Sequence, residues 1–206
     1  MSKDVVLAPG LWMPSGVLWL LASRLRRAGF QPQLFSYRGR APFESNVERL
    51  VRFARDTLGA RPAHYIGHSL GGLLVFETLN RHPEIAVASA LLLGAPVRGS
   101  LAGRRFGRAR FGRWFLGDSA PCWEARDARW TRAAPLGVLA GTAVFGLGRV
   151  VGGPLPGDND GVVCVDETSV EGATASIRVA EAHSLMIASG EVGRLAERFL
   201  RTGSFG

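Results

Sequence analysis

The segment that most constrains the fold of this chain is Gly67-His68-Ser69-Leu70-Gly71. It lies between a short apolar run at residues 64–67 and a helical pattern over residues 70–80. Glycines on both sides of a central serine give the space that a strained strand-to-helix turn needs. The pattern therefore predicts a strand, a sharp turn that exposes the serine, and a helix that packs close to the strand.

Strand-like and helix-like segments alternate along the rest of the chain. Helical apolar spacing marks residues 15–28, 47–58 and 191–200, and strands are expected at residues 5–8, 33–36, 86–93, 136–144 and 177–179. Alternation of this kind favours an α/β architecture. We expect a mostly parallel, doubly wound sheet with helices on both faces.

Residues 98–132 depart from this alternation, because they are rich in Arg, Gly and Trp and show no clear period. We interpret them as an excursion from the sheet, a small basic cap or lid. A length of 206 residues suits one domain that includes this excursion.

The composition, with 47% hydrophobic and 20% charged residues, is that of an ordinary globular protein. The net charge of +8 comes almost wholly from arginine, since Lys3 is the only lysine. The arginines are scattered as well as clustered, so specific nucleic-acid binding is not expected. In the cap they stand beside aromatic residues, a pattern that suits either peripheral contact with an anionic membrane or a solvated loop. The aromatic residues are Phe106, Phe111, Trp114 and Phe115, and the arginines are Arg104, Arg105, Arg108, Arg110 and Arg113.

Cysteine usage and the apolar segments bear on metal binding and location. Cys122 and Cys164 have no partner Cys or His at metal-ligand spacing, so neither a zinc site nor a disulfide framework is expected. The apolar run near the N-terminus is too short for a signal peptide, and no apolar stretch reaches the length of a membrane span. We expect a cytoplasmic protein.

A serine in such a turn becomes a nucleophile only if a base activates it. His64 in a strand and His82 at a helix end have structural explanations, and the ring of His68, inside the turn, is expected to point away from a substrate. His183 follows the last expected strand, on a loop that can reach over the sheet. We predict His183 as the base of Ser69, the alternative being a surface histidine at a helix terminus.

Four acids precede this histidine and could orient it: Asp158, Asp160, Asp166 and Glu167. Asp160 is favoured because it lies in a loop after the strand expected at residues 136–144, with Gly161 allowing a tight turn. The order Ser, Asp, His along the chain matches the order of a catalytic triad whose serine lies in such a strand-to-helix turn. The alternative is an ordinary polar turn. The loop lacks the acid spacing of an EF-hand, so calcium is a minor alternative.

Acyl transfer also needs two backbone donors for the oxyanion. We predict the N–H of Leu70, directly after Ser69, and the N–H of Leu11, after the first strand. Trp12 and Met13 are candidate walls of a substrate pocket. Leu73 and Trp19 are further candidate walls, and the alternative for all four residues is a place in the protein core, where such side chains are found more often.

Several segments together resemble small bacterial lipase- or esterase-like α/β-hydrolases of the serine hydrolase superfamily. They are Gly10-Leu11-Trp12, residues 66–72, residues 93–100, Gly141-Thr142, residues 159–163 and Ala182-His183-Ser184. The resemblance implies Ser69 as nucleophile, Asp160 as acid, His183 as base and carboxylic esters or lipids as substrates. It also implies Leu11 and Leu70 as oxyanion donors, and the reaction needs no metal or organic cofactor. One departure is Pro9-Gly10 where the family usually has His-Gly, which removes a side chain and an N–H from the oxyanion loop.

Two other functions use the same residues or the same surface. An acyltransferase or thioesterase would keep the same Ser, Asp and His, and the sequence does not separate it from an esterase. A non-catalytic binding module would use the basic face. The complete Ser/Asp/His set favours an enzyme.

Overall fold

The computed structural model describes residues 2–108, 110–144 and 153–206. At its centre lies a sheet of six strands in the order β2-β1-β3-β4-β5-β6, and every neighbouring pair is parallel. The predicted parallel sheet is therefore confirmed. The strands are β1 Asp4–Ala8, β2 Gln31–Leu34, β3 Ala63–His68, β4 Val87–Leu93, β5 Leu136–Gly141 and β6 Ala175–Val179.

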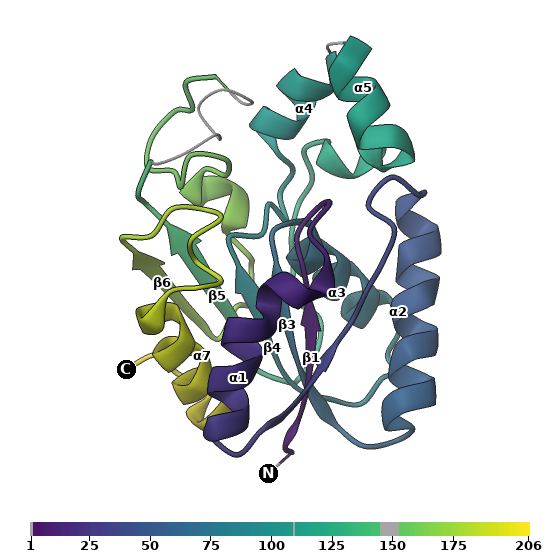
Figure 1. Ribbon diagram of the computed structural model, residues 1–206, viewed down its shortest axis with the longest axis vertical. Coiled ribbons are helices and arrows are strands. Elements are labelled where there is room, and N and C mark those ends of the chain that lie inside the picture. Colours follow the sequence, from purple (N-terminus) through teal and green to yellow (C-terminus); the bar gives the residue numbers. More distant parts are fainter. Residues whose placement is uncertain (1, 109, 145–152) are drawn as a thin grey trace.

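Helices cover both faces of this sheet. The α-helices described are α1 Trp19–Arg27, α2 Phe43–Leu58, α3 Leu70–Arg81, α4 Leu101–Arg108, α5 Arg110–Leu116 and α7 Gly190–Thr202. The 3-10 helices are η1 Ser15–Leu18, η2 Gly117–Trp123 and η3 Val165–Thr168. Helices α1 and α7 lie on one face and α2 and α3 on the other (Figure 1).

The core consists of two apolar layers, because successive strand residues point to opposite faces. In β1, Val5 and Leu7 pack on the side of α1 and α7, whereas Val6 and Ala8 pack on the side of α2 and α3. All four are fully buried. Beyond Asp4, this parallel strand is thus apolar on both faces.

The connections that follow the neighbouring strands β1 and β3 run to opposite faces of the sheet. The helix that follows β1, α1, covers one face, and the helix that follows β3, α3, covers the other. Loops leaving neighbouring strands toward opposite faces open a crevice at the carboxyl edge of the sheet. Gly10 follows β1 and Ser69 follows β3, so both border this crevice.

The predicted excursion contains two α-helices, α4 and α5, followed by η2, and these sit above the carboxyl edge of the sheet (Figure 1). Helix formation here has little signal in the sequence, because glycines lower helix propensity. Local hydrogen bonds and tertiary packing stabilise these helices instead. The Ser100 hydroxyl accepts from the N–H of Gly103 at 3.0 Å, and a side chain at Gly103 would meet the Trp123 ring at 2.9 Å.

Other boundaries differ from the expected ones by a few residues. Strand β2 starts two residues earlier than expected and includes Pro32, which a strand at the sheet edge tolerates. The helix expected from residue 15 begins as a 3-10 turn, and β5 ends at Gly141 rather than at residue 144. None of the helices in the described part of the chain is long and apolar enough to cross a membrane.

Candidate active site

Ser69 occupies a strained backbone conformation between β3 and α3, with φ 54° and ψ −126°. L-residues other than glycine rarely adopt positive φ, and such strain concentrates at functional positions. Tight packing enforces the turn, since a side chain at Gly71 would lie 2.2 Å from the carbonyl oxygen of Pro9. The Ser69 N–H donates to the carbonyl of Leu93 at 2.9 Å. The strand, turn and helix predicted around Ser69 are therefore present.

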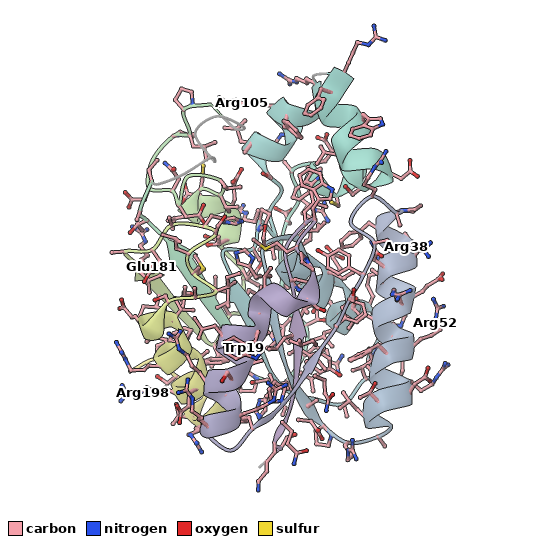
Figure 2. All side chains as sticks on the ribbon, viewed as in Figure 1. Trp19, Arg38, Arg52, Arg105, Glu181 and Arg198 are labelled. Carbon is pink, nitrogen blue, oxygen red and sulfur yellow. The ribbon has the colours of Figure 1, made fainter. Side chains whose placement is uncertain are left out.

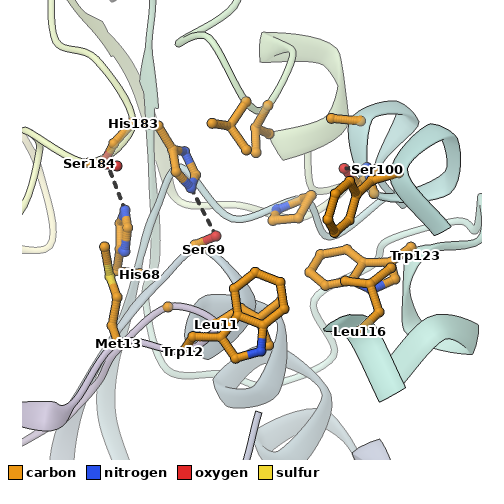
Figure 3. A pocket seen from close by; sticks show the side chains of 17 residues that line it. Leu11, Trp12, Met13, His68, Ser69, Ser100, Leu116, Trp123, His183 and Ser184 are labelled. Carbon is orange, nitrogen blue, oxygen red and sulfur yellow. Dashed lines mark hydrogen bonds between the residues drawn. The ribbon is translucent and has the colours of Figure 1, made fainter. Parts of the chain in front are cut away.

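Two hydrogen bonds connect Ser69, His183 and Asp160 in a line. The Ser69 hydroxyl donates to His183 Nε2 at 2.9 Å (Figure 3). His183 Nδ1 donates to Asp160 Oδ2 at 2.7 Å. Because a carboxylate only accepts, this second bond fixes the proton of a neutral imidazole on Nδ1 and leaves Nε2 as an acceptor.

Asp160 is buried and its orientation is fixed by its own loop. The N–H groups of Val162 and Val163 donate to Oδ1 at 2.9 and 2.7 Å. The carbonyl of Asp160 accepts the N–H of His183 at 3.0 Å. Gly141 permits this approach, since a side chain there would lie 2.8 Å from Asp160 Cβ.

The other three candidate acids lie elsewhere. Asp158 is exposed and forms an ion pair with Arg178 at 2.9 Å, and Asp166 is exposed in η3. Glu167 accepts the N–H of Cys164 at 2.9 Å and the N–H of Leu101, at the start of α4, at 2.5 Å. Burial raises the pKa of Glu167. The carboxylate that contacts His183 is thus Asp160.

Of the three remaining histidines, His64 and His82 lie away from the cavity and His68 borders it. His64 contacts Ser89 Oγ at 2.7 Å, and burial lowers its pKa; His82 contacts Glu84 at 2.9 Å. His68 lies at the site, because its ring is 4.8 Å from that of His183 and it borders the cavity. The position of His68 next to Ser69 in the sequence was a signal that its ring would lie here.

The loop opposite His183 is a turn at Gly10-Leu11-Trp12-Met13, in which the N–H of Met13 donates to the carbonyl of Gly10 at 3.2 Å. Trp12 has a positive φ of 55°. A side chain at Gly10 would lie 3.2 Å from Ser69 Cβ, so the turn packs directly beside Ser69. The two N–H groups predicted to bind the oxyanion lie next to this contact. Leu11 directly follows Gly10, and Leu70 directly follows Ser69. Leu70 is also the first residue of α3, where an N–H has no acceptor within the helix.

Pro9, the departure from the family pattern, has a specific contact. Its carbonyl accepts the Tyr37 hydroxyl at 3.0 Å. Burial raises the pKa of Tyr37, so the hydroxyl stays protonated and remains a donor. Tyr37 therefore anchors the loop that precedes Gly10. No pattern in the sequence pointed to this contact, which joins residues 28 positions apart.

A cavity of about 340 Å³ opens beside Ser69. Trp12 and Met13 line it, whereas Leu73 is buried in the core and Trp19 is 63% exposed on α1. Figure 3 shows the cap side of the wall with Leu116 and Trp123 across from Ser69. Apolar cap residues that the sequence analysis did not assign to the pocket complete it: Ala102, Gly103, Phe106, Leu116 and Trp123.

Within residues 2–108, 110–144 and 153–206, no cluster of three His, Cys, Asp or Glu side chains could hold a metal ion. The site combines a hydroxyl, an imidazole acceptor and a buried carboxylate, the three kinds of group that nucleophilic catalysis by a serine requires.

A sequence model of the alpha/beta hydrolase fold matches residues 25–139, more than half of the chain. The protein belongs to this family. A search of curated protein sequences found no match. Solved structures with a similar fold include an esterase, a pyrethroid hydrolase and a lipase.

Three of these structures resemble almost the whole chain. A metagenomic carboxyl esterase has a TM-score of 0.70 and 16% identity, over 98% of this chain and 74% of the esterase. The pyrethroid hydrolase PytH has a TM-score of 0.69 and 13% identity, over 98% and 99%. A monoacylglycerol lipase from Paleococcus ferrophilus has a TM-score of 0.62 and 18% identity, over 99% and 96%. At these identities the likeness shows a shared fold.

Proposed function

We propose that the protein is a serine hydrolase of carboxylic esters that works through an acyl-enzyme on Ser69. The observation that carries this proposal is the hydrogen-bonded line from Ser69 Oγ to His183 Nε2, 2.9 Å, and from His183 Nδ1 to Asp160 Oδ2, 2.7 Å. A line of this order, with the acid buried, is the arrangement that activates a serine.

In the proposed reaction His183 takes the proton of Ser69 as the hydroxyl oxygen attacks the ester carbonyl carbon. The N–H groups of Leu11 and Leu70 stabilise the negative charge that develops on the carbonyl oxygen. His183 then gives its proton to the leaving alcohol, and the acyl group remains on Ser69. Water, activated by His183, releases the carboxylic acid and restores the hydroxyl. Asp160 holds the imidazole in the required tautomer throughout.

The lining of the cavity favours a substrate that is an ester with an apolar part, either a small-molecule ester or the acyl ester of a lipid. Its walls are mainly apolar side chains from the turn at residues 10–13 and from the cap, with the Ser69 hydroxyl at one side. Apolar walls around a few polar groups are typical of small-molecule sites. A series of p-nitrophenyl esters of increasing acyl length would measure which chain the cavity accepts.

The test of the proposal is covalent labelling by a fluorophosphonate probe, which reacts with activated serines. We expect labelling of the wild type and none of Ser69→Ala. Ser184→Ala removes another hydroxyl at the cavity and should retain the label, which makes it the matched control. Absence of Ser69-dependent labelling in a folded protein would rule out the hydrolase.

We also propose that the outer surface of the cap contacts anionic membranes. Phe111 and Trp114 are 64% and 60% exposed on α5, with rings stacked at 6.3 Å, and the Arg40 guanidinium lies 4.6 Å from the Trp114 ring centre. Residues 98–116 carry no acid, and arginine stands at positions 98, 104, 105, 108, 110 and 113. Exposed aromatic rings among arginines suit an interface with negatively charged head groups.

Vesicle sedimentation tests this contact, using Ser69→Ala to prevent turnover. We expect binding that rises with the fraction of phosphatidylglycerol in phosphatidylcholine vesicles and that is lost in a Phe111→Ser/Trp114→Ser variant. Trp19→Ser is the control, because Trp19 is equally exposed but lies on α1, away from the cap (Figure 2). Binding that ignored the anionic lipid, or that survived the cap substitutions, would overturn the proposal.

A further inference from the structure

His68 is the last residue of β3 and the neighbour of Ser69, and the reaction described above leaves it without a role. Its side chain is 1% exposed. Its ring lies against the ring of His183 at 4.8 Å, with the planes tilted by 43°. A buried polar ring in this position needs an explanation, because an apolar side chain would avoid the cost of desolvating two nitrogen atoms.

One of those nitrogens contacts the backbone of the base. His68 Nε2 lies 3.0 Å from the carbonyl oxygen of His183. Since a carbonyl only accepts, Nε2 carries the proton and donates. Burial, reinforced by the neighbouring His183, lowers the pKa of His68 to about 3. The ring is therefore neutral over the pH range of an esterase assay, and it keeps a single N–H, the one that holds His183.

The other nitrogen faces the opposite wall of the site. Nδ1 is buried and has no hydrogen-bond partner among the described residues. It lies next to Gly10, where a side chain would come within 3.1 Å of it. The ring of His68 thus lies between two segments. On one side it is next to Gly10, the first residue of the turn at residues 10–13, and on the other it contacts the loop of His183.

Apart from the hydrogen bond from His68, two hydrogen bonds to Asp160 hold His183 in its loop. Its N–H and its Nδ1 both bind Asp160, at 3.0 and 2.7 Å, so these two bonds tie it to one neighbouring loop. The hydrogen bond from His68 ties the same residue to β3, the strand that carries Ser69. It therefore connects the base to the element that presents the nucleophile.

We propose that His68 is a positioning residue that holds His183 in line with Ser69 and supports the turn at Gly10 from behind. This role rests on the proposed hydrolase function. Displacing a reacting group by about 1 Å can cost roughly 100-fold in rate. Loss of the His68 hydrogen bond should lower kcat and leave KM nearly unchanged, because His68 borders the cavity but is only 1% exposed and offers a substrate almost no surface.

The experiment compares His68→Leu with His68→Gln. Leucine fills the space without a donor, whereas the side-chain amide of glutamine can place an N–H near the position of Nε2. We expect His68→Leu to lower kcat for a p-nitrophenyl ester by roughly 10- to 100-fold with KM within about twofold of the wild type. We expect His68→Gln to recover most of that loss.

The control is His64→Leu, which removes a second buried histidine from the same strand. His64 contacts Ser89 and lies at the opposite end of β3, so this variant should lose stability but keep its kcat per active site. Fluorophosphonate titration counts the active sites in each preparation, which separates a slower site from a smaller folded fraction.

Three outcomes decide the inference. Equal kcat per active site in His68→Leu and the wild type would overturn the role of His68 and leave the hydrolase proposal intact. A loss in His68→Leu that His68→Gln does not recover would overturn the hydrogen bond as its cause. An unlabelled and inactive wild type would instead disprove the hydrolase itself.

Discussion

The two sides of Ser69 are built differently. On one side, a side-chain hydrogen bond of 2.9 Å joins Ser69 to His183, and a second one of 2.7 Å joins His183 to Asp160. On the other side, the turn that starts at Gly10 is positioned by packing, with its backbone against Ser69 and with the Pro9 carbonyl bound to Tyr37. The side with His183 and Asp160 depends on the identity of its side chains, and the side with the turn at Gly10 depends on the path of its backbone. Substitutions on the first side should remove chemistry, and substitutions on the second should shift geometry.

The largest effect is expected from Ser69→Ala. Removing the nucleophile should lower kcat by roughly 10⁴- to 10⁶-fold, because no neighbouring group replaces an activated hydroxyl. Serine and alanine are both strained at the positive φ of residue 69, so the melting temperature should change little. Steady-state kinetics and thermal denaturation measure the two quantities. Turnover above about 1% of wild type would show that Ser69 is not the nucleophile.

Asp160→Asn and His183→Ala should each lower kcat by roughly 10³- to 10⁴-fold and leave the protein folded. The asparagine would stabilise the wrong tautomer of His183, and the alanine would remove the base. Asp158→Asn is the matched control, because Asp158 sits two positions away and pairs with Arg178 on the surface. An active Asp160→Asn together with an inactive Asp158→Asn or Asp166→Asn would reassign the acid.

Gly10→Ala probes the opposite side and should cost roughly 100-fold in kcat, the scale of one lost oxyanion donor. Its methyl group would lie 3.1 Å from His68 Nδ1, 3.2 Å from Ser69 Cβ and 3.3 Å from Met13 Sδ, so either the turn or these side chains must shift by a few tenths of an ångström. Gly16→Ala, where a side chain meets nothing within 4 Å, is the control. If both variants kept wild-type kcat, the placement of this turn would not matter for turnover.

His68 links the two sides and makes stability depend on pH. Its pKa is about 3 in the folded protein against 6.5 for a free side chain, so below about pH 6.5 the unfolded chain takes up a proton that the folded protein does not. Its contribution to the free energy of unfolding is complete above pH 6.5 and falls by about 1.4 kcal/mol per pH unit below it.

Urea denaturation at pH 7, 6 and 5 measures this slope. Over that range the wild type should lose about 2 kcal/mol more than His68→Gln, which has no titrating group at this position. Equal losses in the two proteins would mean that His68 can take up a proton in the folded state.

The smallest effect is expected from Tyr37→Phe. Losing the hydrogen bond to Pro9 should cost about 1 kcal/mol of stability and reduce kcat by a few fold, because the turn loses one anchor. Tyr65→Phe is the control, since the buried Tyr65 hydroxyl has no partner among the described residues and its removal should be neutral. Equal kinetics in the two variants would show that Tyr37 does not position the turn.

The sequence predicted the sheet and the side chains that meet at its edge because local patterns carry that information. Buried parallel strands are continuous apolar runs, and a strained turn requires glycines near Ser69. Asp160 and His183 follow the last two strands, so their loops had to emerge at the same edge as Ser69. The helices of the cap were not predicted, because α4 has a weak helical signal and depends on contacts such as Gly103 against Trp123.

By itself, then, the sequence determined the α/β architecture and the strand, turn and helix around Ser69, since periodicity and glycine placement act over a few neighbouring residues. Tertiary structure decided which acid contacts His183, how the Pro9 loop is anchored and where His68 lies. Those contacts join segments far apart in the chain, such as His68 and the carbonyl of His183, 115 positions away. Their distances follow from packing of the whole fold, which local sequence patterns do not encode.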